Sequence, residues 1–426
     1  MSEKQRTGAT AAPARPSFAA MRHPGFRAQF FTFMIAMMAD NIEHVISYWV
    51  MFGKFHSPAL QGFAVVSHWL PFLLFSVAAG ALAERFDPRR VVQCGMALFI
   101  VASLGWGLSF VTGQLQMWQA MVLLVIHGCA GVLWSAPGQM LTYDIVGPAD
   151  LQSAVRLSAT ARYVGILAGP GVGGVMLLVL GPSLGILVNT LFYLPVVIWL
   201  VNAPYGPKFR NGIPPPRRAV RGLSDIVQTV RDIAGHRVIL VMTALGGCYA
   251  FFVGNAYQTQ MPGFATDLGH GDPGVAYSVL LAADAAGAMV AGVLLESGAL
   301  LVASPRTAIM LAIAWAAALT GFATSAVYPL AVALLFAAGF FELTFNSMAQ
   351  ALVQIKAPLE IRGRVLGLYN MANLGLRTFS GVTVGLVGSR IGVHASLALF
   401  AAVVLAIAGT LLRAVVAPAP KAGGAS

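Results

Sequence analysis

Three titratable residues stand close together inside an otherwise apolar segment near the start of the chain. Asp40, Glu43 and His44 occupy positions i, i+3 and i+4, so a helix places all three side chains on one face. Carboxylates and an imidazole held this close repel one another or share protons. This spacing predicts a site that takes up and releases protons, with Asp40 as the carrier. The alternative is that Asp40 only forms a hydrogen bond to a neighbouring helix.

Other polar residues interrupt later apolar segments one or two at a time. A charge at the centre of a bilayer costs at least about 2.5–3.5 kcal/mol, so it survives where water, a partner or a substrate offsets that cost. We therefore expect these residues to line an internal cavity. Arg377 is expected either to pair with Asp284 or Glu342 or to recognise an anionic substrate. The set comprises His127, Asn255, Asp284, Glu342, Asn373 and Arg377.

The composition indicates that lipid is the main solvent of this chain. Of its 426 residues, 58% are hydrophobic and 10% are charged, against about 25% charged residues in soluble domains. So few polar side chains cannot cover the surface of a soluble globular enzyme.

The sequence carries no enzyme motif. It lacks a G-x-x-x-x-G-K-[ST] phosphate loop, which excludes direct ATP hydrolysis, and it lacks a zinc-protease motif and a nucleophile elbow. Cys94, Cys129 and Cys248 are far apart and indicate neither disulfides nor a metal site. We expect no enzymatic activity, no cofactor and no metal, with energy drawn from an ion gradient or from the gradient of the substrate.

Twelve apolar windows are each long enough to cross about 30 Å of hydrocarbon as a helix. With the N-terminus in the cytoplasm, nearly all of the 26 lysine and arginine residues fall on the cytoplasmic side, as the positive-inside rule requires. The net charge of +11 therefore fits anionic lipid rather than nucleic acid. The windows are residues 26–51, 59–83, 91–111, 117–140, 153–178, 183–201, 238–261, 274–295, 307–326, 328–350, 365–387 and 393–415.

The windows divide the chain into two six-helix bundles with a polar segment between them. Within that segment Ile226, Val230 and Ile233 recur at helical spacing after the candidate N-cap Ser224, which predicts a short amphipathic helix on the cytoplasmic face. A plain solvated linker is the alternative. The expected parts are a disordered tail (1–22), the N-terminal bundle (23–203), the linker (204–237), the C-terminal bundle (238–416) and a second tail (417–426).

The two bundles resemble each other in sequence. Residues 80–84 (GALAE) end the second span and resemble residues 292–296 (GVLLE) at the end of the eighth. Residues 148–151 precede the fifth span and resemble residues 358–361 before the eleventh. Six-helix repeats of this kind build many secondary transporters, whose substrate site lies between the repeats.

Residues 80–90 (GALAERFDPRR) resemble the loop signature G-x-L-x-D-R-x-G-R-[RK] of the major facilitator superfamily. Glu84 stands where Asp is usual. It can accept a hydrogen bond from an arginine or cap a helix N-terminus, and the arginines can bond the carbonyl ends of neighbouring helices. We expect a gate here, or else arginines that only enforce topology. The residues of this loop are Gly80, Glu84, Arg85, Arg89 and Arg90.

Residues 165–174 (GILAGPGVGG) resemble the fifth-span signature G-x-x-x-G-P-x-x-G-G, which in the superfamily is associated with exporters. Its glycines let another helix approach closely, and Pro170 is expected to kink the helix. Close packing without a gating role is the alternative. The residues are Gly165, Gly169, Pro170, Gly173 and Gly174.

The fourth span departs from the pattern of proton-coupled exporters in the superfamily. Where these usually carry R-x-x-Q-G, residues 127–131 read HGCAG. The arginine associated with proton coupling is thus replaced by His127, which can itself titrate or can be a buried, hydrogen-bonded histidine.

The resemblance is to the twelve-span effector and efflux branch that includes the enterobactin exporter and macrolide efflux proteins. It implies an all-α integral membrane protein with twelve transmembrane helices in two six-helix pseudo-repeats, in the bacterial inner membrane, with both termini cytoplasmic. We expect a monomeric secondary transporter that exports a small amphiphilic molecule, drug-like or siderophore-like, by alternating access in exchange for protons. An importer or facilitator of the same fold is the alternative.

Overall fold

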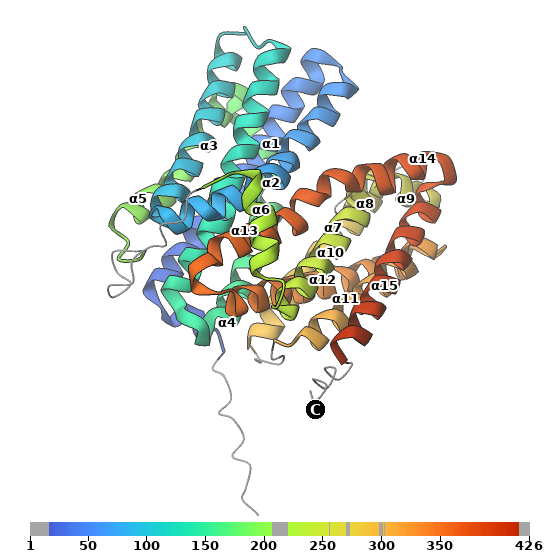
Figure 1. The fold of residues 1–426 in the computed structure, drawn as a ribbon. Coiled ribbons are helices and arrows are strands. Elements are labelled where there is room, and N and C mark those ends of the chain that lie inside the picture. Colours follow the sequence, from blue (N-terminus) through green and yellow to red (C-terminus); the bar gives the residue numbers. More distant parts are fainter. Residues whose placement is uncertain are drawn as a thin grey trace, which may run out of the picture.

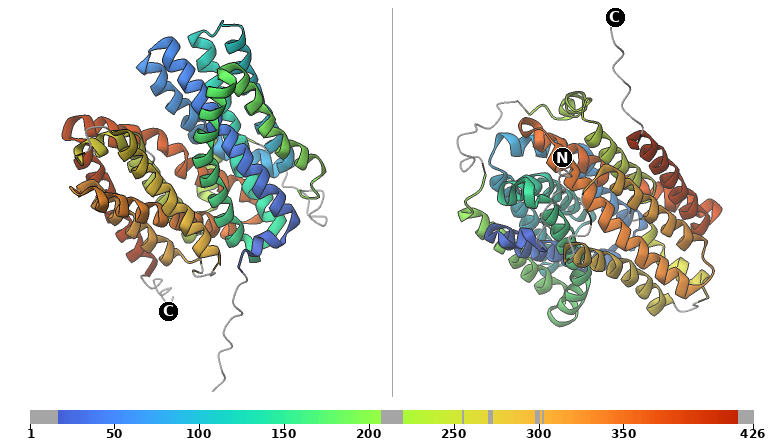
Figure 2. Two further views of the ribbon diagram at one scale, coloured as in Figure 1. Left: turned by 180° about the vertical axis from the view of Figure 1, so that it is seen from behind. Right: turned by 90° about the horizontal axis from the view of Figure 1, so that it is seen from below.

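The structure is a computed structural model and describes residues 17–206, 220–254, 256–269, 273–297, 301 and 303–416. All regular elements within these ranges are helices. They form two bundles that meet at the lower end of Figure 1, where the described chain begins and ends, and that diverge toward the upper end. Figure 2 shows the same divergence from behind. We call these the termini end and the opposite end.

The N-terminal bundle contains one very long helical segment, α4, which breaks twice. Gly147 (φ 66°) and Gly181 (φ 72°) leave the helical conformation, and each is followed by a proline. The segment thereby supplies the predicted fourth and fifth spans and the start of the sixth. The elements are η1 (Ala19–Arg22), α1 (Pro24–Phe55), α2 (Pro58–Arg85), α3 (Pro88–Val111), α4 (Met117–Asn189), η2 (Thr190–Tyr193) and α5 (Leu194–Asn202).

The C-terminal bundle is less regular than the sequence predicts. The seventh span leaves the helix after Phe252, and the eleventh changes from α-helix to shorter helical turns after Asn373. Gly375 follows that second break and lies directly against the backbone of Leu73 in α2. The elements are α7 (Arg237–Phe252), α8 (Ala256–Thr259), α9 (Met261–Asp267), α10 (Pro273–Ser297), α11 (Pro305–Thr324), α12 (Tyr328–Lys356), η4 (Leu359–Ile361), α13 (Arg362–Asn373), η5 (Gly375–Phe379), η6 (Gly381–Leu386), α14 (Val387–Ile391) and α15 (Val393–Val416).

The predicted twelve-helix fold is confirmed. Within the described residues, eight helical segments are long and apolar enough to span a membrane, and one of them, Met117–Asn202, contains three crossings because of its two glycine breaks. The helix α1 and the broken segment from α13 to α14 complete the twelve. Both carry the polar residues of the cavity, which makes them less apolar than the rest.

Each bundle has its own aromatic and aliphatic interior. In the N-terminal bundle Phe99 stacks on Tyr193 with ring centroids 5.1 Å apart, and in the C-terminal bundle Trp315 meets Tyr249 edge-on at 5.0 Å. Apolar side chains also cover the outside, for example Leu104 and Leu108 of α3, which are exposed in the isolated chain. Such a surface is suited to lipid.

Two predictions about the segments outside the bundles are wrong in part. Ordered chain begins before residue 23, because η1 is helical and Ala20 is buried; residues 1–16 and 417–426 lie outside the described residues. The linker does contain a helix, α6 (Leu223–Asp232), but its N-cap is Gly222 rather than Ser224. The linker residues 207–219 lie outside the described residues.

The helix α6 also presents a different face to the protein from the one predicted. Asp225 and Thr229 are buried and Ile226 packs on the core, whereas Val230 is exposed. The reason is that α6 lies against α2 and α13, whose basic residues attract the carboxylate of Asp225.

Candidate functional site: a cavity between the two bundles

A cavity of about 480 Å³ lies between the two bundles. Its walls come from α1, α2 and α4 on one side and from α8, α12, α13 and η5 on the other. Aromatic and aliphatic side chains alternate with charged and amide groups along these walls. The charged and imidazole groups that line it are Asp40, His44, His68, His127, Arg162, Glu342 and Arg377.

On the N-terminal wall, His127 of α4 lies between two carboxylates of α1. Its Nδ1 is 2.9 Å from Oε1 of Glu43 and its Nε2 is 2.7 Å from Oδ1 of Asp40. Ser103 of α3 donates a hydrogen bond to the other oxygen of Glu43. Exposure is 8% for Asp40, 3% for His127 and 1% for Glu43. The structure thus brings together the residue that replaces the usual arginine and the two acids that the α1 spacing singles out.

The imidazole of His44 shares the cavity face of α1 with Asp40 and touches two further imidazoles. Its ring centroid is 4.8 Å from that of His127 and 5.0 Å from that of His68 on α2. The sequence analysis did not single out His68. A polar residue inside an apolar span is itself an indication of an inward-facing position, and this signal was available.

On the C-terminal wall, two carboxylates lie beside the same hydroxyl group. The Oη of Tyr257 is 3.2 Å from Asp284 Oδ2 and 3.4 Å from Glu342 Oε2. Tyr249 and Tyr163 both donate to the other oxygen of Glu342. Asp284 and Glu342 are each 4% exposed, and Oδ1 of Asp284 has no hydrogen-bond partner among the described residues.

Arg377 connects this acidic pair to the rest of the cavity. Its Nη2 donates to Tyr249, which in turn donates to Glu342, so the arginine reaches that carboxylate through a tyrosine. Its Nε donates to the backbone oxygen of Asn373 at 3.1 Å, and its guanidinium lies 5.2 Å from the ring of Trp69 in the other bundle. Asn373 lines the cavity as well, while Asn255 lies outside the described residues.

At the termini end, Glu84 of α2 joins the two bundles. One of its oxygens accepts the backbone N–H of Arg364 at 2.7 Å, in the first turn of α13, and the other forms an ion pair with the guanidinium of Arg364. Asp225 of α6 lies 3.4 Å from the same guanidinium. Gly80 and Gly363 allow this approach, because a Cβ on either would overlap the backbone of the other.

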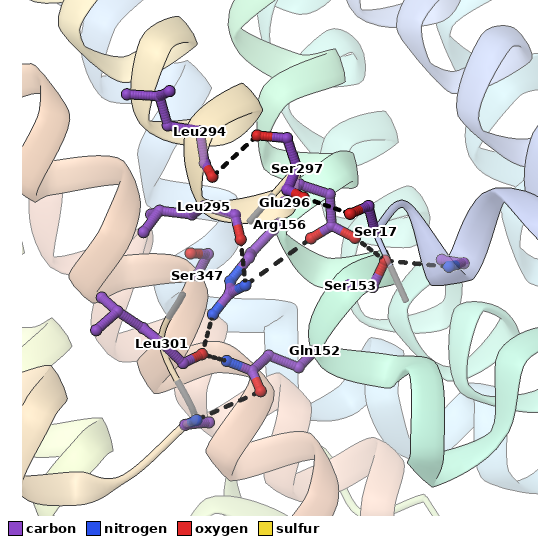
Figure 3. A network of polar contacts seen from close by, with 12 residues as sticks. Ser17, Gln152, Ser153, Arg156, Leu294, Leu295, Glu296, Ser297, Leu301 and Ser347 are labelled. Atoms are coloured by element: carbon purple, nitrogen blue, oxygen red, sulfur yellow. Dashed lines mark hydrogen bonds and ion pairs between the residues drawn. The ribbon is translucent and has the colours of Figure 1, made fainter. Parts of the chain in front are cut away.

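A second contact closes the same end on the other side of the molecule (Figure 3). Arg156 of α4 donates to the backbone oxygens of Leu295 and Leu301, and its Nη1 is 3.9 Å from Glu296. Ser153 donates to Glu296, and Gln152 donates to Leu301 at 2.7 Å. The sequence analysis treated residues 292–296 only as a repeat, so it missed this gate.

The arginines of the loop motif behave differently from one another. Arg89 donates to the backbone oxygen of Ala203 and pairs with Asp87 at 2.6 Å, so it binds a helix end within its own bundle. Arg90 bonds Gln93, and Arg85 lies over the ring of Phe86. Neither of these last two contacts is with the carbonyl end of a neighbouring helix, which is the contact that the motif predicted.

The glycine motif of α4 packs against α1. A Cβ on Gly165 would meet Met37, one on Gly169 would meet Asn41, and one on Gly173 would lie 3.2 Å from the Cα of Ile42. The residues touched alternate with Asp40 and Glu43 along α1, so this contact positions the titratable face. A Cβ on Gly174 would meet nothing within 4 Å, and Pro170 is exposed, with helical torsion angles on both sides of it.

The sequence profile of the transmembrane secretion effector family matches residues 15–424. The chain belongs to this family of the major facilitator superfamily. It is a multi-pass membrane transporter and not an enzyme.

Among curated relatives, a putative multidrug resistance protein, MdtD of Salmonella typhi, is 29% identical over 120 residues, and its counterpart in Salmonella typhimurium is 28% identical over the same length. These matches cover 28% of this chain and about a quarter (24%) of the length of the relatives.

Solved structures share the fold at low identity. The transporter FucP in its outward conformation has a TM-score of 0.72 at 12% identity, covering 94% of this chain and 100% of that one. The human organic anion transporter MFSD10 (TETRAN) has a TM-score of 0.72 at 12% identity, covering 93% and 100%. The proton:xylose symporter XylE has a TM-score of 0.70 at 15% identity, covering 92% and 96%.

The glycine contact predicts a position-dependent effect of added side-chain volume. Gly169→Val and Gly173→Val should force α1 away from α4 and, at about 1–3 kcal/mol for overpacking, lower the melting temperature in detergent. Transport should fall while membrane insertion stays normal. Gly174→Val is the matched control, because it adds the same side chain to the same helix where space is open. Equal melting temperatures for all three variants would contradict the packing argument.

The Glu84 contact predicts a shift between conformations. Removing one partner of a buried ion pair costs about 3–5 kcal/mol, so Glu84→Gln should favour separation of the bundles at the termini end by a factor on the order of 100. Spin labels at the exposed positions Arg90 and Leu359, in a cysteine-free background, should report a new longer distance. Asp87→Asn is the control, since Asp87 pairs within its own bundle. An unchanged distance distribution in Glu84→Gln would refute the gate.

Proposed function

We propose that this transporter exports a small amphiphilic molecule by alternating access, with its termini end in the cytoplasm of a bacterial cell and with one chain as the working unit. The observation that carries the proposal is the position of the cavity. It lies between bundles that are held together at the termini end by Glu84 and Arg156 and that diverge at the opposite end. This is the arrangement of an outward-facing state.

The contacts at the termini end are suited to reversible opening. They are ion pairs, hydrogen bonds to backbone oxygens and glycine contacts, not one continuous apolar interface. The ring of Tyr143 adds a further contact of this kind, 3.5 Å from the guanidinium of Arg362 across the two bundles. Polar groups of this sort can be rehydrated when the bundles part, which lowers the barrier between two packed states.

The lining of the cavity supports an amphiphilic cargo. Trp69, Trp134 and Phe99 offer aromatic surface, while Arg377 and Glu342 offer both signs of charge. Export rather than import is supported by the name of the matched family and by the glycine motif of α4. The symporters that share the fold are reasons to keep import as the alternative.

We further propose that the exchanged ion is the proton and that the Asp284–Glu342 pair holds it. Two buried carboxylates beside one tyrosine hydroxyl are more stable when a proton is shared between them. Arg377, Arg162 and the hydroxyls of Tyr163 and Tyr249 face this pair from the cavity side, and one carboxylate oxygen of Asp284 is left without a partner. Asp40, the carrier predicted from the sequence, instead lies 2.7 Å from His127.

Export itself is tested by comparing the growth medium of cells with and without the gene. Metabolites that accumulate outside only when the gene is present identify the cargo class. Counterflow of such a compound in vesicles of known orientation then gives the direction. Accumulation of the compound inside intact cells that carry the gene would show that the protein is an importer.

The same vesicles test the coupling site. Asp284→Asn should abolish uphill transport driven by a pH gradient yet leave downhill exchange nearly unchanged, since a neutral side chain mimics the protonated state. Asp150→Asn is the control, because Asp150 pairs with His23 outside the cavity. If Asp40→Asn gives that behaviour and Asp284→Asn does not, the N-terminal bundle carries the proton and the acidic pair does not.

A further inference from the structure

Three histidines from three different helices meet at one wall of the cavity. His44 of α1, His68 of α2 and His127 of α4 each offer one ring nitrogen, and these three atoms lie within 4.8 Å of one another. The ring centroids of His68 and His127 are 5.8 Å apart, and the other two pairs are closer. All three side chains line the cavity, so a solute that enters it reaches them.

Two nitrogens of this cluster are buried and lack a hydrogen-bond partner among the described residues. They are Nδ1 of His68 and Nε2 of His127. The second lies 2.7 Å from Oδ1 of Asp40, but in a direction that forms no hydrogen bond. A buried polar atom without a partner is unfavourable, by about 1–3 kcal/mol, so a ligand that bonds to it is stabilised by that amount.

The surroundings of His127 are those of a metal-bound histidine. Its Nδ1 is 2.9 Å from Glu43, and Glu43 is in turn held by Ser103. A carboxylate on one nitrogen fixes the ring orientation and leaves the other nitrogen as a ligand, which is the usual outer arrangement at protein metal sites. Asp40, next to that other nitrogen, can supply a fourth ligand.

The ligand set selects the class of ion. Imidazole nitrogens suit zinc, nickel, cobalt and copper, whereas magnesium and calcium prefer oxygen ligands. Three imidazoles and one carboxylate form a complete tetrahedral set for zinc. The carboxylates of Asp40 and Glu43 also offset the double positive charge of the ion in a cavity with few other anions nearby.

We propose that His44, His68 and His127, with Asp40 as the fourth ligand, bind one divalent transition-metal ion in the outward-facing cavity. Tetrahedral zinc–nitrogen bonds of about 2.1 Å place ligand nitrogens roughly 3.4 Å apart. The three nitrogens therefore draw together by an ångström or somewhat more on binding, which side-chain rotation supplies. The site concerns binding and does not depend on the direction of transport.

Binding is measured on the purified full-length protein with an affinity tag that contains no histidine. Titration calorimetry with Zn²⁺ and with Ni²⁺ should show one tight site per chain, and Mg²⁺ should show none. His44→Ala and His68→Ala should each weaken Zn²⁺ binding at least ten-fold. Glu43→Gln should weaken it by about 10–100-fold, as expected for a residue that orients a ligand.

Matched controls separate this site from surface histidines. His56→Ala and His236→Ala remove exposed histidines outside the cavity and should leave the affinity for Zn²⁺ unchanged. Lack of a one-to-one site in the unaltered protein, or equal affinity in His68→Ala, would overturn the proposal.

A second measurement needs no variant and covers the case in which a substitution prevents folding. Co²⁺ added to the unaltered protein should give the intense visible absorption of a tetrahedral site with nitrogen and oxygen ligands, and excess Zn²⁺ should remove it. The weak absorption of octahedral Co²⁺, unaffected by one equivalent of Zn²⁺, would mean that only surface groups bind the metal, and the proposal would fail.

Discussion

The arrangement of the two bundles depends on one buried contact, in which the carboxylate of Glu84 holds the N-terminal turn of α13. Both of its oxygens are used, one by the backbone N–H of Arg364 and one by the guanidinium of the same residue. In a region of low dielectric constant such a pair is strong, and an unpaired carboxylate there is costly. The contact therefore closes one end of the molecule and leaves the cavity open toward the other. Gly80 and Gly363 are small because the backbones must touch for this bond to form.

The two walls of the cavity carry different chemistry although the bundles are repeats of one another. The N-terminal wall gathers three imidazoles with Asp40 and Glu43, and the C-terminal wall gathers Asp284 and Glu342 with tyrosine hydroxyls and Arg377. Imidazole nitrogens are good ligands for a soft or borderline cation, while two adjacent carboxyls are good carriers of a proton. This difference lets one cavity hold a cargo on one wall and a counter-ion on the other. Arg377, which lies over Trp69 of the opposite bundle, joins the two walls.

The predictions from sequence were most accurate where a periodic pattern determines the structure. Twelve apolar windows and the distribution of basic residues were enough for the fold. They were less accurate where a local contact decides: the helical segment at the eleventh span breaks after Asn373 because Gly375 lies against α2, and α6 is turned by the attraction between Asp225 and Arg364. Of the loop arginines, Arg89 contacts a helix end, and Arg85 and Arg90 do not. No periodic signal in one chain separates these three.

The sequence by itself determined the class of the molecule, because hydrocarbon requires apolar helices of a given length and tolerates charges only inside the bundle. It also determined that Asp40, Glu43 and His44 share one face, since that follows from helical periodicity alone. Only the tertiary structure decided which groups face them. His68 and His127 are 24 and 83 residues from His44 in the chain, and they reach it because α2 and α4 pack beside α1, at distances that the glycines of α4 allow. Spacing along one helix carries no information about a neighbour on another, so the three-histidine cluster became visible in three dimensions.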